Sequence, residues 1–270
     1  MAKVRADVLL VQRGLAETRE KAQALVMAGQ VFIGEAEVTK QGMFVREDAK
    51  VVVREPLRYV SRGGLKLEKA LDEFGLDVGG RVLADVGAST GGFTDCLLQR
   101  GAKRVYAIDV GYGQLHWKLR QAPRVVIVEK TNIRHLEGLP EPVDGATVDV
   151  SFISLTLVLP KVAELVSPEG WIVALVKPQF EAGKEHVRKG GVVKDAAVHR
   201  QVLERVLGWA IGNGLHVAGA TESPLVGPAG NKEFLVYLRK QGPGIVPNDA
   251  INGVFAGAGA EKTGKGDDSG

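Results

Sequence analysis

RVLADVGASTGGFTDCLLQR (residues 81–100) combines an apolar run, a glycine-rich turn and a helix-like segment in immediate succession. The apolar run meets an acidic residue at Asp85, and the turn that follows contains Gly87, Gly91 and Gly92. In α/β proteins, a nucleotide-like ligand commonly lies where such a turn leads from a strand into a helix N-terminus. The stretch therefore predicts the first strand of an α/β sheet with a ligand site above it.

Apolar runs alternate with helical patterns after this stretch. The predicted strands are 81–86, 104–110, 125–129, 145–152, 170–178, 215–224 and 233–240. Most are short unbroken apolar runs, which is typical of strands covered by helices on both faces. Residues 155–166 and 197–211 predict helices, so the alternation predicts a doubly wound, mostly parallel α/β sheet. Only residues 225–232 separate the last two runs, and we therefore expect these two strands to pair antiparallel.

The residues before the sheet show a different pattern. Two amphipathic segments (7–16 and 18–29) precede a stretch of alternating apolar and polar residues (30–45), which predicts a small α+β domain. The predicted boundaries are a first domain at 1–58, a basic linker at 59–64, the sheet domain at 65–242 and a flexible tail rich in Gly and Ala at 243–270.

The composition excludes several classes of protein. With 45% apolar and 25% charged residues, the 270-residue chain can bury a full core, and a net charge of +3 permits an RNA partner without requiring one. The single cysteine, Cys96, excludes a disulfide framework within one chain. The histidines lack zinc-site spacing, so we expect no metal. Neither a signal peptide nor a membrane-length apolar run is found, and we expect a cytoplasmic protein.

The polar residues near the first three strand ends suit an adenosyl ligand. The glycine spacing differs from the dinucleotide fingerprint G-x-G-x-x-G, and Asp85 would repel a pyrophosphate. That carboxylate suits the sulfonium and amino groups of S-adenosylmethionine. Asp109 stands where ribose hydroxyls need an acceptor, and Asn132 could hydrogen-bond the adenine. We therefore predict S-adenosylmethionine as the cofactor; the alternative is a turn that only lets helix and strand pack closely.

A second set of charged residues is expected at the same edge of the sheet. Asp149 and Lys177 follow the fourth and fifth predicted strands, Glu233 opens the last strand, and Lys66 precedes the first. A neighbouring cation lowers the pKa of an amine, whereas a carboxylate raises it. Lys66 close to Lys177 would therefore leave more of that amine free to accept the proton of a ribose 2′-hydroxyl. Asp149 and Glu233 would orient both amines. The alternative is that Lys177 only extends from a strand end into solvent.

Motifs in both halves of the chain resemble known families. RADVLLVQRGLAETREKAQALVMAGQVFIGEAEVTKQGMFV (residues 5–45) resembles the S4 RNA-binding domain, and residues 65–240 resemble FtsJ-like (RrmJ-like) ribose 2′-O-methyltransferases with a Rossmann-like sheet. With SRGGLKL, DVGASTGGFTD, DVGYGQL, DVSFISL, VKPQFE and GNKEF, the joined pair is similar to the TlyA family of rRNA cytidine 2′-O-methyltransferases, often labelled haemolysin A.

The resemblance implies roles for individual residues. The catalytic Lys-Asp-Lys-Glu tetrad of FtsJ-like enzymes matches Lys66, Asp149, Lys177 and Glu233. The implied S-adenosylmethionine contacts are Gly87, Gly91, Phe93, Asp109, Asn132 and Asp149. Thr90 and Phe93 replace a common Pro and Trp, and Asn132 replaces a common Asp, which would alter cofactor affinity.

The S4-like helices offer Arg5, Arg19 and Lys21 as phosphate contacts, and Arg62 and the loop residue Lys189 offer two more. The expected partner is rRNA or a ribosomal subunit. Two other functions stay open at this point: a membrane-acting cytolysin, as the haemolysin label suggests, and a non-catalytic RNA-binding factor. A methyltransferase acting on a base has less support, since it would not need two lysines.

Overall fold

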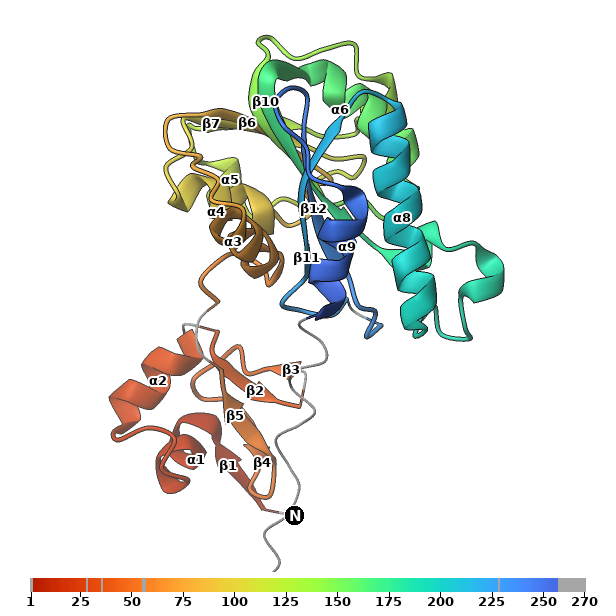
Figure 1. Ribbon diagram of the computed structural model, residues 1–270. Coiled ribbons are helices and arrows are strands. Elements are labelled where there is room, and N and C mark those ends of the chain that lie inside the picture. Colours follow the sequence, from red (N-terminus) through yellow and green to blue (C-terminus); the bar gives the residue numbers. More distant parts are fainter. Residues whose placement is uncertain (1, 28, 35, 55–56, 228, 257–270) are drawn as a thin grey trace, which may run out of the picture. The chain divides into compact units, whose positions relative to one another are not determined.

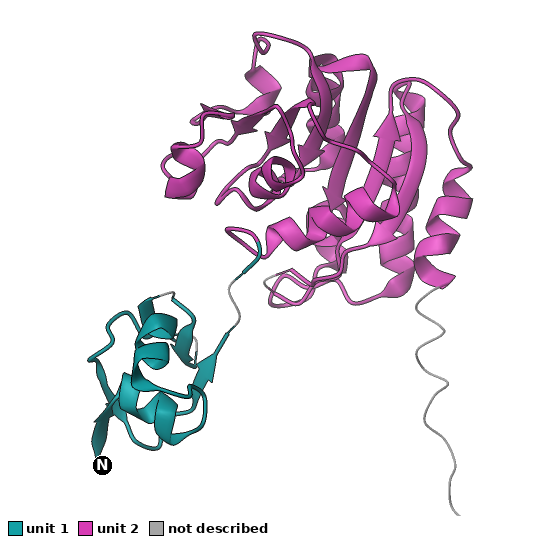
Figure 2. Ribbon diagram, turned by 90° about the vertical axis from the view of Figure 1, so that its left-hand side faces the viewer, with its two compact units in different colours: residues 1–58 teal, residues 59–270 magenta. Residues whose placement is uncertain are grey.

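The computed structural model describes residues 2–27, 29–34, 36–54, 57–227 and 229–256. The chain forms two compact units, residues 1–58 and 59–270, which are coloured separately in Figure 2. Within the described residues, no helix has the length and apolar character needed to cross a membrane.

Unit 1 packs two helices against short strands. Its elements are β1 (Lys3–Arg5), α1 (Ala6–Gln12), α2 (Arg19–Met27), β2 (Val31–Ile33), β3 (Ala36–Glu37), β4 (Phe44–Arg46) and β5 (Val51–Val53). β1 pairs with β4, and β2 lies between β3 and β5, all antiparallel. Leu9, Leu10 and Val26 of the helices are buried with Val31 of β2 in a small core. The predicted α+β character is therefore present, with more strands than the expected pair.

Unit 2 is built on a seven-stranded sheet with the order β11-β12-β10-β9-β6-β7-β8. Its strands are β6 (Val82–Val86), β7 (Arg104–Ile108), β8 (Val125–Val128), β9 (Val143–Val148), β10 (Val166–Val176), β11 (His216–Glu222) and β12 (Phe234–Arg239). All neighbours pair in parallel except β12, which is antiparallel to both β10 and β11. The predicted mixed sheet, with its last strand antiparallel, is confirmed.

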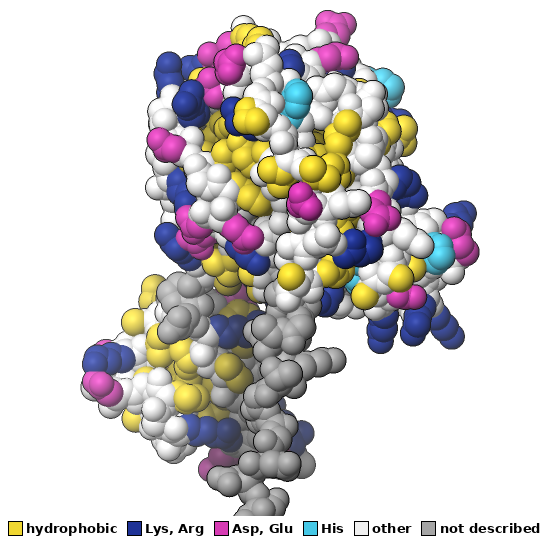
Figure 3. All heavy atoms as spheres, viewed as in Figure 1, with side chains coloured by type: hydrophobic (Ala, Val, Ile, Leu, Met, Phe, Trp, Pro, Cys, Tyr) yellow, Lys and Arg dark blue, Asp and Glu magenta, His cyan; other side chains and the backbone are white. Residues whose placement is uncertain are grey.

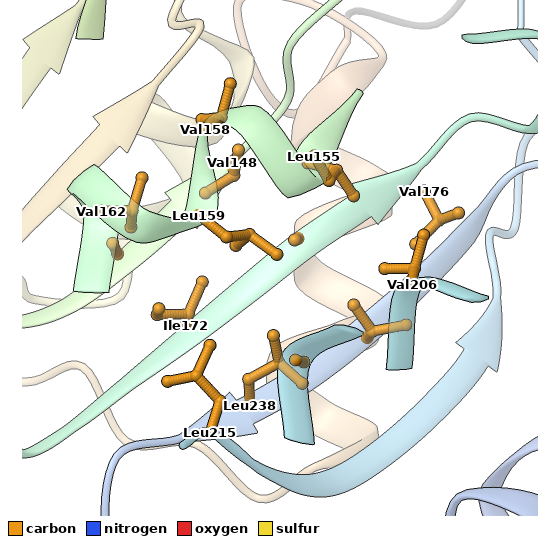
Figure 4. Close-up of a cluster of buried hydrophobic side chains, with 14 of the residues drawn as sticks. Val148, Leu155, Val158, Leu159, Val162, Ile172, Val176, Val206, Leu215 and Leu238 are labelled. Atoms are coloured by element: carbon orange, nitrogen blue, oxygen red, sulfur yellow. The ribbon is translucent and has the colours of Figure 1, made fainter. Parts of the chain in front are cut away.

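Helices cover both faces of this sheet (Figure 1). The α-helices of unit 2 are α3 (Gly63–Glu73), α4 (Gly92–Gln99), α5 (Trp117–Arg120), α6 (Leu159–Leu165), α7 (Pro178–Glu181), α8 (Ala196–Gly212) and α9 (Pro247–Ala256), and the 3-10 helices are η1 (Ile133–His135), η2 (Leu155–Leu157) and η3 (Lys184–His186). Apolar residues of α3, α4 and α5 pack on one face, and those of α6, α8 and α9 pack on the other. Figure 4 shows part of the second cluster, with Leu159 of α6 near Ile172 of β10, and Val206 of α8 near Val176 at the end of the same strand.

Two predicted segments differ in the structure. Residues 247–256, expected in a flexible tail, form α9, because Ala250, Ile251 and Val254 bury an apolar face in the core of unit 2. Residues 257–270 of that tail lie outside the described residues. The predicted linker 59–64 belongs to unit 2: Tyr59 is buried, and the backbone N–H of Val60 donates to Asp95 of α4 at 2.8 Å.

Candidate active site

The topology brings four of the predicted residues to one edge of the sheet. β6 to β10 are parallel, so their carboxyl ends share this edge, and Asp109, Asp149 and Lys177 directly follow β7, β9 and β10. β12 runs the other way and therefore begins at the same edge, directly after Glu233. Val176 pairs with Phe234 in the β10–β12 register, so Lys177 and Glu233 are the next residues on adjacent strands.

Lys177 is held by two residues of the loop that follows β9. Its Nζ lies 2.6 Å from Asp149 Oδ1 and donates a hydrogen bond to Ser151 Oγ at 2.9 Å. The Lys177 side chain is mostly buried, whereas the Asp149 carboxylate is more open. The ammonium group therefore has a fixed position close to solvent-accessible space, as a group that exchanges a proton with a substrate requires.

Lys66 and Glu233 form the second lysine–carboxylate pair. Lys66 of α3 donates to Glu233 Oε2, and the Glu233 carboxylate is 1% exposed. A Cβ at Gly227 would lie 2.5 Å from Glu233 Oε1, so the backbone of the β11–β12 loop packs directly on this carboxylate. Each lysine of the site therefore has its own carboxylate partner, Glu233 for Lys66 and Asp149 for Lys177.

A pocket of about 400 Å³ opens beside Asp149. Its lining residues come from the loops after β6, β7, β8 and β9: Gly87, Ser89, Asp109, Val110, Gln114, Thr131, Asn132, Ile133, Asp149, Val150, Ser151, Phe152 and Ile153 among them. Gly87 has φ +84°, and a Cβ there would lie 2.4 Å from the Asp149 carbonyl oxygen. Only glycine therefore lets the β6 turn pass this close to the loop that carries Asp149.

The polar groups of the pocket fit an adenosyl ligand. The Asp109 carboxylate accepts the backbone N–H groups of Ser89 and Gly111, each at 2.7 Å, which fixes it at the end of β7. Asn132 caps η1, because its Oδ1 accepts the Arg134 backbone N–H at 3.1 Å. Its amide nitrogen is thus the group that it can offer to an adenine ring nitrogen, where an aspartate would instead accept a hydrogen bond.

Both units of the chain match models of known protein families. The model described as FtsJ-like methyltransferase matches residues 59–240, which is more than half of the chain. The chain belongs to the FtsJ-like methyltransferase family. The S4 domain model matches residues 4–51.

Individual relatives extend across both units. The Bacillus subtilis protein YqxC is 53% identical and covers 90% of this chain and 88% of its own. A Mycobacterium tuberculosis protein named 16S/23S rRNA (cytidine-2′-O)-methyltransferase TlyA is 47% identical and covers 88% of this chain and 91% of its own. A solved protein of Streptococcus thermophilus is 47% identical and superposes with a TM-score of 0.73 over 96% of both chains. The FtsJ-like unit and the S4 domain therefore occur together in similar proteins.

Three predicted cofactor contacts do not line the pocket of this FtsJ-like unit. Asp85 is fully buried inside β6, where its carboxylate accepts the hydroxyl groups of Thr94 (2.6 Å) and Thr147 (3.1 Å). Burial raises the pKa of Asp85 to about 6. Gly91 has φ +96° and faces Leu119, and Phe93 is buried in the core beneath α4. The prediction of direct contact does not match these positions, because all three residues build the turn from inside.

The predicted RNA contacts divide into anchored and exposed residues. Arg5 and Arg19 both pair with the buried carboxylate of Asp7, at 2.9 and 3.0 Å. Hydrogen bonds from Arg5 in particular hold the pKa of Asp7 well below its usual range. Lys21 pairs with Glu17 on the surface. The two arginines keep exposed portions, but their guanidinium groups are fixed by the fold of unit 1.

In unit 2, Arg62 is exposed directly before α3, and Lys189 is exposed next to the Arg188–Val192 bridge. On the face shown in Figure 3, Lys and Arg side chains are interspersed with Asp and Glu, which agrees with the small net charge. On this face, the described Lys and Arg side chains therefore do not form one continuous positive surface.

Two residues of the site were missed in the sequence. Ser151, which holds Lys177, lies within the predicted strand 145–152, where a serine gives no signal of such a role. Phe152 was placed at the end of a strand, but it has φ +63°, is 90% exposed, and lies with its ring centroid 4.9 Å from that of Phe180. An apolar run predicts burial, so the pattern could not reveal that β9 ends at Val148 and that the following residues form a loop.

Proposed function

We propose that the chain transfers the methyl group of S-adenosylmethionine to the ribose 2′-hydroxyl of a cytidine in 16S or 23S rRNA, or in both. The observation that carries the proposal is the position of Lys177, fixed by Asp149 and Ser151 at the rim of the pocket and next to the Lys66–Glu233 pair. The name of the Mycobacterium tuberculosis relative supports the same reaction and substrate.

Different residues of the pocket would contact different parts of the cofactor. Asp109 would accept the ribose hydroxyls, Asn132 would donate to the adenine, and Gly87 leaves room for the chain beside Asp149. When bound, S-adenosylmethionine supplies a methyl group attached to a positively charged sulfur. Within the described residues, no group of three His, Cys, Asp or Glu side chains could hold a metal ion.

The tetrad handles the proton and the orientation of the substrate. In its neutral amine form, Lys177 Nζ would take the proton of the attacking 2′-hydroxyl and become an ammonium, while Asp149 and Ser151 keep that nitrogen in place. Lys66, fixed by Glu233, adds a second cation that helps to orient the ribose oxygen. Most of the rate enhancement would come from holding the 2′-oxygen in line with the methyl group and the sulfur, since no oxyanion accumulates on the substrate.

The S4 unit would hold the RNA. Arg5, Arg19 and Lys21 of unit 1, with Arg62 and Lys189 of unit 2, would contact phosphates, which position the RNA without specifying its sequence. The 2′-hydroxyl itself distinguishes RNA from DNA, because it is the atom to be methylated. With rRNA as substrate, the protein would act in the cytoplasm.

Methyl transfer to rRNA tests the proposal directly. The full chain and its Lys177→Ala variant are incubated with S-adenosylmethionine and rRNA from cells lacking the gene, and methylated nucleosides are mapped by mass spectrometry. We expect a ribose-methylated cytidine with the wild type and about 10³-fold slower transfer with Lys177→Ala. Lys161→Ala on α6, whose lysine pairs with Glu164, is the matched control. Transfer to a base, or an unchanged rate for Lys177→Ala, would contradict the proposal.

A further inference from the structure

Glu181 is a buried carboxylate to which the proposed reaction gives no role. It ends α7, four residues after Lys177 in VKPQFE, and its side chain is 2% exposed. Carboxylates are rarely buried this deeply unless they are paired and hydrogen-bonded. The partners of Glu181 therefore indicate what its burial stabilises.

Those partners lie at the start of η2. Glu181 Oε1 accepts the backbone N–H of Leu155 at 2.7 Å, and Oε2 accepts the Ser154 hydroxyl at 2.8 Å. Arg205 of α8 lies 3.2 Å from Oε2 and also donates to the Glu181 carbonyl oxygen. The carboxylate thus satisfies a backbone donor at the helix N-terminus and joins η2 to α7 and α8.

The active-site loop, residues 149–155, is consequently held at both ends by the turn after β10. Lys177 binds its start, through Asp149 and Ser151, and Glu181 binds its end, through Ser154 and Leu155. Between these attachments, Phe152 adopts a left-handed conformation that is costly for a bulky residue. Such strain persists only where the surrounding contacts fix the backbone.

We propose that Glu181 is a positioning residue for methyl transfer: by fixing the far end of the active-site loop, it keeps Asp149 and Ser151 where they hold Lys177 Nζ. The inference rests on the proposed function. A displacement of 1 Å at reacting groups can lower a rate by about 10²-fold. Since the partners of Glu181 are Ser154, Leu155 and Arg205 rather than the cations predicted to bind RNA, its loss should lower kcat and leave the KM for rRNA unchanged.

The test compares two substitutions in the full chain. Glu181→Leu introduces an apolar side chain of similar volume and removes both acceptors, and we expect kcat to fall by about tenfold or more. In Glu181→Gln the amide oxygen still accepts from Leu155 and the amide nitrogen can donate to the Ser154 hydroxyl, so kcat should return to within about threefold of wild type. Glu204→Gln on α8, which alters an exposed carboxylate paired with Arg200, should match wild type.

An unchanged kcat for folded Glu181→Leu would overturn the inference, and so would a Gln variant no better than Leu. If Glu181→Leu does not fold, Ser154→Ala removes the hydroxyl bond to Glu181 together with the N-cap that Ser154 Oγ gives to the Thr156 backbone N–H, and kcat should fall by about two- to fivefold. An unchanged kcat for Ser154→Ala would then overturn it. An inactive wild type in the same assay would instead contradict the proposed function, so the two failures are distinguishable.

Discussion

Asp7 of unit 1 and Asp85 of unit 2 are both completely buried, yet their carboxyl groups have opposite pKa shifts. The Arg5 guanidinium is the largest cause of the lowered pKa of Asp7, and Gln23 and Arg19 add further hydrogen bonds. For Asp85, desolvation is the largest cause and outweighs the hydrogen bonds from Thr94 and Thr147, and the Asp149 carboxylate acts in the same direction as desolvation, so the pKa of Asp85 rises to about 6.

The difference shows that burial alone does not decide whether a carboxylate is charged. Desolvation favours the neutral form at both sites, and only cationic partners reverse it. The same two networks contain residues that the sequence predicted to contact RNA or the cofactor. Arg5 and Arg19, which are predicted to contact RNA, keep exposed portions while they pair with the buried Asp7, whereas Asp85, which was expected to face the cofactor, lies entirely inside unit 2.

Removing the Asp7 carboxylate should have the largest effect. We expect Asp7→Ala to lower the free energy of unfolding of unit 1 by about 3 kcal/mol, because it removes charge-assisted hydrogen bonds from Arg5, Arg19 and Gln23. Unit 1 has a small core and little stability to spare. Native-state hydrogen exchange on the full chain should therefore show faster exchange confined to residues 1–58.

Asp48→Ala is the matched control, since Asp48 pairs with Arg46 on the surface and its loss should leave the protection of unit 1 close to that of wild type. Equal protection of unit 1 in Asp7→Ala and wild type would show that the buried network does not stabilise it.

The second prediction concerns the pH dependence of unit 2. Because the folded pKa of Asp85 is about 6 and its ordinary value is 3.8, the native state binds more protons between these values. Its stability should therefore fall as the pH rises from 4 to 6, by about 2 kcal/mol from this group. Asp85→Asn cannot ionise and should remove that decrease, as measured by urea unfolding across this range.

Asp7 should show the opposite sign. Its lowered pKa contributes stability that is complete above the ordinary value and is lost as the pH falls below it. If the stability of Asp85→Asn falls between pH 4 and 6 as steeply as that of wild type, another group must cause the decrease. The contrast between the two aspartates would then not hold.

The smallest expected effect comes from the two threonines. Thr94→Val removes the hydroxyl that donates to Asp85 at 2.6 Å, and we expect a loss of about 1–2 kcal/mol at pH 7, where the carboxylate is charged. Thr147→Val removes a longer bond of 3.1 Å and should cost less. Both losses should shrink at pH 4, where Asp85 is protonated. Equal losses at the two pH values would indicate a packing effect instead.

The sequence predicted the sheet well because apolar periodicity and turn residues are local signals. It also placed Asp109, Asp149, Lys177 and Glu233 at one edge, since parallel topology brings strand ends together. It could not show which polar residues face inward. Asp85 lies two residues before the pocket-lining Gly87, and only the three-dimensional positions of Thr94 and Thr147 decide that its carboxylate is internal. Ser151 and Glu181 were missed for the same reason, because their partners lie on other elements.

The pair formed by Lys66 and Glu233 has a consequence for protein synthesis. The two residues are separated by 167 positions, and Glu233 enters the site only because β12 returns to the edge at which the parallel strands end. During translation, a growing chain that does not yet include β12 lacks this pair, even when β6 to β10 have already folded. The protein that is proposed to modify ribosomal RNA therefore completes its own active site only after nearly all of it has left the ribosome.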